Sequence, residues 1–325
     1  MSLITVCVSD MLEISSVKDV IFPDFATRIS PIIEIPRTDP QQFSNLLFVK
    51  ARDATPELIT ASDGLLLVID GGIGLSPNEM AAWNHAADNT IPRNVLAFNV
   101  QSSRADFDEV VAIVERVLEP DAMVRYLPIE NDDETQFAGI YDVLTGDIHD
   151  YSTGVLEIRH GDPEHMSLTA DKREALFEEL AHHGLDDESL KAHELGMPLN
   201  ITTLERIWTS TDIIAVIPID DGVGNDVLRS WLKAIAPRWL PSVTEGEQTT
   251  FANEANVRVG LCVTDGLIRM WGEPKDEARV LKTKFGTETF VADFETIGLA
   301  IAPGTHTGDV VLPVGSNLAL LAPNF

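Results

Sequence analysis

The chain has 325 residues, a hydrophobic share of 44% and a formal net charge of -29. The hydrophobic share excludes an intrinsically disordered chain, and the length suits two domains or one large domain with an insertion. The negative charge disfavours non-specific binding of nucleic acid, which requires Lys and Arg to displace counterions.

The sequence patterns favour a cytoplasmic location. The first ten residues lack the basic end and the long apolar stretch of a signal peptide. No apolar run reaches the roughly 18 to 20 residues of a bilayer span. Cys7 and Cys262 lie far apart in the sequence and make no disulfide framework. We therefore expect a cytoplasmic protein that does not bind a membrane.

Strands and helices are predicted to alternate in the first part of the chain. Continuous apolar runs rich in β-branched residues predict four strands: Leu3–Ser9, Ser44–Ala51, Gly64–Asp70 and Asn94–Asn99. A helix is expected from Ser76, a capping residue with Glu79 three positions later, to about Ala87. Apolar residues at helical spacing predict another helix over Phe107–Leu118. This alternation is typical of βαβ units and of a mostly parallel sheet.

The pattern changes between about residues 127 and 210, where the chain is more acidic. We expect a hairpin over Phe137–Tyr151 and helices over Ala170–His182 and Asp186–His193. The α/β rhythm then returns with a strand over Asp212–Ile219 and a helix from about Asp226 to Ile235. Residues 127–210 are therefore interpreted as an α+β subdomain inserted into the α/β domain.

A second domain is predicted after the α/β part. The stretch Ser242–Thr250 has the composition of a linker, and short strands separated by turn residues follow it. This pattern favours a small all-β domain, interpreted as a barrel. The expected division is residues 1–243 for the α/β domain and residues 251–325 for the barrel.

This order of parts resembles the first two domains of elongation factor G and its relatives, the translational GTPases. The similarity is clearest in Ser62–Asn99 and Leu127–Tyr151 and extends to Leu228–Ser242 and Thr296–Val311. The resemblance implies a P-loop-NTPase-like domain with degenerate nucleotide motifs, followed by a barrel similar to domain II of translation factors.

The phosphate-binding motif of such a GTPase is degenerate here. That motif needs Gly-rich backbone around the phosphates, a Lys that neutralises them, and a Ser or Thr on magnesium. The equivalent stretch Ser9–Asp19 contains no Gly. Ser15 and Ser16 suit the magnesium position, but no Lys precedes them and Lys18 follows them.

The other nucleotide motifs are also incomplete. The motif that senses the γ-phosphate, Asp-x-x-Gly, is reduced to Asp53, because Pro56 stands at the Gly position. The guanine-reading motif keeps Asn99, which can still brace a loop, but Ser102 replaces the carboxylate that pairs with guanine. The vestigial nucleotide-site positions are therefore Ser15, Ser16, Asp53 and Asn99.

These observations favour a non-catalytic pseudo-GTPase that needs no cofactor. It would act by binding a protein partner, such as a ribosomal or translation-associated protein, rather than nucleic acid or a membrane. The alternative is a divergent translation factor that still binds GTP and magnesium. An enzyme with an unrelated site ranks last, because no acid–base or nucleophile pattern stands out.

Two further clusters have both a ligand interpretation and a structural one. The acidic, glycine-rich stretch Asp220–Asp226 offers oxygen ligands for calcium, but its spacing and composition favour a strand-to-helix turn. His160 and His165 flank Asp162 and Glu164 and are compatible with zinc, but a solvated loop is favoured. No catalytic or metal-ligating residue is therefore assigned.

Overall fold

The computed structural model describes most of the α/β part and a smaller share of the C-terminal part. The described residues are 2–22, 32–36, 43–100, 107–120, 122–131, 137–195, 197, 207–208, 214–236, 242–245, 248–251, 259–264, 267–271, 280–283, 288–290, 292–293, 299–301, 305–306, 310–313 and 319–321.

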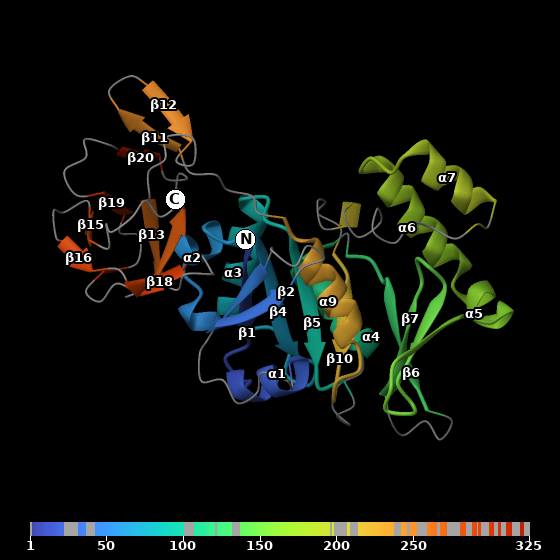
Figure 1. The fold of residues 1–325 in the computed structure, drawn as a ribbon. Coiled ribbons are helices and arrows are strands. Elements are labelled where there is room, and N and C mark those ends of the chain that lie inside the picture. Colours follow the sequence, from blue (N-terminus) through green and yellow to red (C-terminus); the bar gives the residue numbers. More distant parts are fainter. Residues whose placement is uncertain are drawn as a thin grey trace.

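A six-stranded sheet forms the centre of the α/β part (Figure 1). Its order is β10-β5-β4-β1-β3-β2, and all neighbouring pairs are parallel except that of β2 with β3. The strands are β1 (Ser2–Val8), β2 (Ile32–Pro36), β3 (Phe43–Lys50), β4 (Gly64–Asp70), β5 (Arg93–Phe98) and β10 (Val216–Ile219). The predicted mostly parallel sheet is confirmed, with β2 as an edge strand that the sequence patterns had not indicated.

Helices cover both faces of this sheet. The helices are α1 (Ile14–Ile21), α2 (Pro56–Thr60), α3 (Pro77–Asp88), α4 (Phe107–Val117) and α9 (Asn225–Ala234), with a short 3-10 turn η2 (Ala51–Asp53). One face packs against α1 and α9, through residues such as Val17 and Trp231. The other packs against α2, α3 and α4, where Trp83 and Val110 are buried. Because side chains alternate along a strand, Val6 faces the first core and Cys7 the second.

The predicted start of α3 is confirmed at the atomic level. Ser76 is the N-cap with extended backbone, and Pro77 occupies the first helical turn. The backbone N–H of Ser76 donates to Glu79 Oε2 at 2.6 Å, which gives a partner to one of the N–H groups left over at the helix start.

In its described residues, the inserted subdomain contains an antiparallel sheet of order β6-β7-β8-β9 and the helices α5, α6 and α7. Its elements are β6 (Tyr126–Glu130), β7 (Phe137–Asp142), β8 (Asp147–Asp150), β9 (Glu157–His160), α5 (Pro163–Leu168), α6 (Ala170–His182) and α7 (Asp187–Glu194). The predicted hairpin and both predicted helices are present, while β6, β9 and α5 had not been predicted. Tyr141 on β7 contacts Thr169 and His165, so one face of this sheet lies against the α5–α6 junction. We call these four strands the insert sheet.

The C-terminal part is built from short antiparallel strands. A seven-stranded sheet has the order β16-β15-β19-β13-β14-β18-β17, and a three-stranded sheet has the order β12-β11-β20. The strands are β11 (Ser242–Glu245), β12 (Gln248–Phe251), β13 (Val259–Thr264), β14 (Leu267–Trp271), β15 (Val280–Thr283), β16 (Glu288–Phe290), β17 (Ala292–Asp293), β18 (Leu299–Ile301), β19 (Val310–Pro313) and β20 (Ala319–Leu321). The predicted all-β character of this part is confirmed.

The predicted linker was wrong. Most of Ser242–Thr250 forms the paired strands β11 and β12, and β11 also pairs with β20. The polar composition of this stretch masked its β-branched content, which includes Val243, Thr244 and Thr249 and suits a strand.

Among the described residues, no helix is both long enough and apolar enough to cross a bilayer.

Candidate functional site

The candidate site lies at the edge of the sheet where the parallel strands end. In a parallel sheet the carboxyl ends of the strands meet at one edge, which is the usual ligand site of open α/β folds. Val8 of β1 pairs with Val68 of β4, so the loops after these strands leave side by side. The Asp10 carboxylate connects the segments that follow β1, β3 and β4, because it accepts from Arg52 N–H of η2 at 3.1 Å and from Asn78 Nδ2 of α3 at 2.9 Å.

Backbone N–H groups in the turn between β1 and α1, residues 9–13, donate hydrogen bonds to acceptors within the protein. Ser9 N–H donates to Val68 O at 2.9 Å, and Leu12 N–H donates to Ser9 O at 3.1 Å. The Leu12 side chain is buried and belongs to the core that contains α1. This turn is therefore folded onto the protein, and at least two of its N–H groups already have protein acceptors.

The same turn lacks the backbone shape of a phosphate cradle. A backbone anion site of the nest type alternates right-handed and left-handed conformations, so that successive N–H groups converge. Non-glycine residues with positive φ in the described chain are Thr90, Asn99 and Asp221, and none lies in this turn. If the eight residues from Ser9 are aligned with the G-x-x-x-x-G-K-[ST] motif, Ser15 falls at the Lys position and Ser16 at the Ser/Thr position. Both serines are exposed on α1.

Charge at this turn is negative. The amide of Asn78 and the backbone N–H of Arg52 hold the pKa of Asp10 below its usual range, so its carboxylate is ionised at neutral pH. Lys18, the nearest cation on α1, does not offset this charge at the turn. Its side chain is buried with its Nζ 5.2 Å from the centre of the Phe48 ring, and burial lowers its pKa.

The remaining vestigial positions follow β3 and β5, and each side chain lies beside a different protein partner. Asp53 lies in η2 with an exposed side chain, 4.0 Å from Arg52. Asn99 follows β5 with φ 59°, and its Nδ2 donates to Asp70 Oδ2 at 3.1 Å. Asn99 therefore links the ends of β4 and β5. Ser102 lies outside the described residues.

The stretch Asp220–Asp226 forms a tight turn between β10 and α9. Val223 N–H donates to Asp220 O at 2.8 Å, and Asp221, Gly222 and Gly224 have positive φ. The Asp226 carboxylate binds His149 and Tyr151, so it does not face a calcium position formed by the loop.

The histidines near residue 160 pair with carboxylates on the surface. His160 Nδ1 lies 3.1 Å from Asp147, and His165 Nδ1 lies 2.8 Å from Asp162. Within the described part of the chain, no three His, Cys, Asp or Glu residues are grouped in a way that suits a metal ion.

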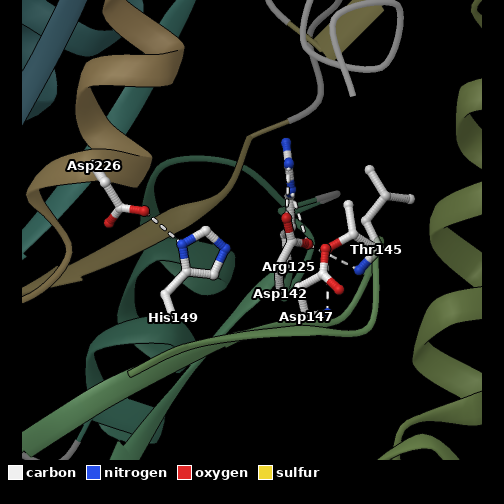
Figure 2. A network of polar contacts seen from close by, with 7 residues as sticks. Arg125, Asp142, Thr145, Asp147, His149 and Asp226 are labelled. Carbon is white, nitrogen blue, oxygen red and sulfur yellow. Dashed lines mark hydrogen bonds and ion pairs between the residues drawn. The ribbon is translucent and has the colours of Figure 1, made fainter. Parts of the chain in front are cut away.

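Two polar networks that involve β7 and β8 of the insert sheet had not been predicted (Figure 2). Arg125 forms a buried ion pair with Asp142, at 2.9 Å between Nη2 and Oδ2. Asp226 lies 2.5 Å from His149 Nδ1 and also accepts the hydroxyl proton of Tyr151. The partners are 17 to 77 residues apart in sequence, so local patterns carried no signal for them.

Comparison with known proteins defines the class first. The fold is similar to a crystal structure of a protein from Thermus thermophilus, with a TM-score of 0.67 at 13% identity over 97% of this chain and 54% of that one. With the topology described above, the chain has a P-loop-NTPase-like α/β fold with an inserted subdomain, followed by a β domain. No protein-family model matches the chain.

Sequence comparison then points to one family of translation factors. The chain is 30% identical over 203 residues to elongation factor G 2 of Shewanella frigidimarina, covering 58% of this chain and 28% of that protein. It is 27% identical over 244 residues to elongation factor G 2 of Vibrio vulnificus, covering 70% of this chain and 34% of that protein. The chain is thus related to elongation factor G, and it spans about a third of the length of these curated relatives.

Proposed function

We propose that this chain is a non-catalytic relative of elongation factor G, a pseudo-GTPase that acts by binding a protein partner in translation. The observation that carries the proposal is the turn between β1 and α1. It lacks Gly, has no lysine at the motif position, and contains the Asp10 carboxylate, whose pKa is held below its usual range.

The physical argument concerns the triphosphate. Binding it takes backbone N–H groups, a cation against the β- and γ-phosphates, and a hydroxyl on magnesium. Here two backbone donors of the turn are already used, and Lys18 packs against Phe48. Of the three requirements, a serine hydroxyl such as that of Ser16 is present, whereas a cation at the motif position is missing and the backbone donors are partly used. A phosphate would also approach the charged Asp10 carboxylate, which repels it.

The surrounding edge supports the same conclusion. Four carboxylates and two cations lie at, or shortly after, the ends of β1, β3 and β4: Asp10, Glu13, Asp53 and Asp70 against Lys50 and Arg52. A net negative edge disfavours a polyanion and is compatible with a protein partner. It also disfavours direct contact with RNA.

One observation favours the alternative, a divergent factor that still binds GTP. Asn99 keeps its place at the end of β5, and its contact with Asp70 orders the loop ends that approach a guanine in this fold. This arrangement supports a base contact under the alternative but supplies nothing for the phosphates.

Titration of the nucleotide-free protein with a fluorescent GTP analogue at millimolar magnesium tests the proposal. We expect no binding at high micromolar ligand, for GTP, GDP or ATP. Micromolar binding that is specific for guanine and is lost in Asn99→Ala would overturn the pseudo-GTPase proposal and support the alternative. Asn84→Ala serves as the matched control, because Asn84 is exposed on α3 and is not one of the nucleotide-site positions.

The partner is tested separately by crosslinking and mass spectrometry in cell lysate. We expect a specific protein of the translation machinery to be enriched over a charge-matched acidic control protein. Enrichment no greater than that of the control would count against the protein-binding role, whatever the nucleotide titration shows.

A further inference from the structure

The insert sheet meets helix α9 at a small joint. On the face of this sheet opposite Tyr141, Ile140 and His149 are cross-strand partners. They face the start of α9, where Gly224 leaves no room for a side chain: a Cβ there would lie 2.4 Å from Pro218 O and 3.1 Å from Ile140 Cδ1. This close approach brings Asp226, in the first turn of α9, into contact with His149 (Figure 2). Asp226 also accepts the hydroxyl proton of Tyr151.

The His149 imidazole is largely buried within a negative environment. Its side chain is 15% exposed, and that of Asp226 is 21% exposed. Asp226 faces it from α9, Asp142 from β7 and Asp147 from β8. On β9 the residue opposite His149 is Ile158, which brings no charge to the joint.

Among the described residues, the other basic side chains near this joint contact other groups, and His160 Nδ1 lies 3.1 Å from Asp147. Arg125 pairs with Asp142, Arg159 lies 3.6 Å from Asp150, and Arg229 of α9 lies over the Phe22 ring. Of the described side chains, His149 is therefore the one that pairs with Asp226 and can place a positive charge against it.

We propose that the His149–Asp226 pair is a pH-sensitive latch, in which protonation of His149 sets how firmly the insert sheet is held against α9. The inference concerns the joint alone and does not depend on whether the chain binds a nucleotide. The neutral imidazole can still donate its Nδ1 proton to Asp226, so loss of the charge loosens the joint without removing its hydrogen bond.

The direction follows from the two ionisation equilibria. Burial disfavours the imidazolium, but the hydrogen bond and charge of Asp226 outweigh burial and raise the pKa of His149 above its usual 6.5. That stabilisation is complete below pH 6.5 and is lost as the pH rises through the folded pKa. Burial likewise opposes the Asp226 carboxylate, yet its partners lower its pKa below 3.8, so its contribution is lost only on strong acidification. The joint is tightest between these limits.

A distance measurement between the insert and the core tests the latch directly. Spin labels at Glu178→Cys on α6 and Asn84→Cys on α3 occupy exposed positions on the two sides of the joint. The natural Cys7 and Cys262 are buried, and burial raises the pKa of the Cys7 thiol, so they react poorly with the label. We expect a narrow distance distribution at about pH 5.5 and a broader one at about pH 8.5, with a midpoint above 6.5.

Variants separate the latch from a general effect of pH. In His149→Gln, the width of the distance distribution should be the same at about pH 5.5 and about pH 8.5. His183→Gln should behave as the parent protein, because His183 pairs with Glu179 on an exposed helix face. Tyr151→Phe should keep the pH dependence, since the Asp226 charge remains. A width that does not change with pH in the parent, or a pH dependence that survives in His149→Gln, would overturn the proposal.

Discussion

At the residue scale, one buried ion pair joins the α/β part to the C-terminal β part. Asp63, fully buried before β4, accepts from Leu3 N–H at 2.8 Å and from Arg269 Nη2 at 2.8 Å. Arg269 comes from β14 and also donates to Ala61 O. A carboxylate so deeply buried requires a cation or several donors, because removing it from water is costly. The pair therefore makes the stability of one part depend on the other.

We predict that Arg269→Met lowers the free energy of unfolding by about 3–5 kcal/mol, because it leaves a buried charge without its cation. Urea denaturation measures the change. The double variant Asp63→Asn/Arg269→Met should recover part of the loss. Arg52→Met is the control, since Arg52 and Asp53 are exposed and 4.0 Å apart, and we expect it to change stability by about 0.5 kcal/mol or less. Equal effects of the two arginine variants would contradict the argument.

At the element scale, the start of α9 depends on Gly224. This residue is the N-cap with φ 90°, a conformation that costs a side chain about 1–2 kcal/mol. Its surroundings add a second restriction, because the space where a Cβ would lie is filled by Pro218 O and Ile140 Cδ1. The absence of a side chain thus lets α9 and the insert sheet approach each other.

Gly184→Ala separates these two effects. Gly184 has almost the same φ, 91°, but nothing within 4 Å of the position of a Cβ. We predict that Gly184→Ala lowers the free energy of unfolding by about 1–2 kcal/mol and that Gly224→Ala lowers it clearly more. The Gly224 variant should also broaden the distribution of spin-label distances between the insert and the core. If urea denaturation showed the same loss of unfolding free energy for both variants, the contact with Pro218 and Ile140 would be energetically unimportant.

At the scale of the whole molecule, the main electrostatic feature is the net charge of -29. A net charge far from zero keeps a protein soluble but destabilises the compact state through self-repulsion. Salt shortens the range of this repulsion, with a Debye length of about 10 Å at 0.1 M and about 3 Å at 1 M. The exposed ion pairs that salt also weakens contribute little, since their median value is about 0–1 kcal/mol.

We therefore predict that the melting temperature rises with ionic strength between about 0.05 and about 1 M NaCl, by roughly 2–4 °C for each kcal/mol gained. Calorimetry at several salt concentrations measures this. KCl at equal ionic strength is the control, and it should give the same rise if screening is the cause. A melting temperature that falls or stays constant with salt would show that attractive pairs outweigh the repulsion.

The sequence by itself determined the elements whose causes are local. Continuous apolar runs marked β1 and β4, and Ser76 with Glu79 marked the start of α3, because burial on both faces and helix capping are properties of neighbouring residues. The absence of Gly and of a Lys at the motif position after β1 was also readable, since the phosphate-binding motif requires both at fixed spacing. The pairing of β11 with β12 was missed because its strand signal is weak against a polar background.

Only the tertiary structure decided the contacts between distant segments. Asp63 with Arg269 and His149 with Asp226 are separated by 206 and 77 residues, and each residue alone is typical of a solvated surface. Their burial arises because the packing of large elements brings them together, and a buried charge then needs its partner. Asp10 shows the same division: its place after β1 follows from the sequence, whereas its bonds to Arg52 and Asn78 follow from three strand ends meeting at one edge.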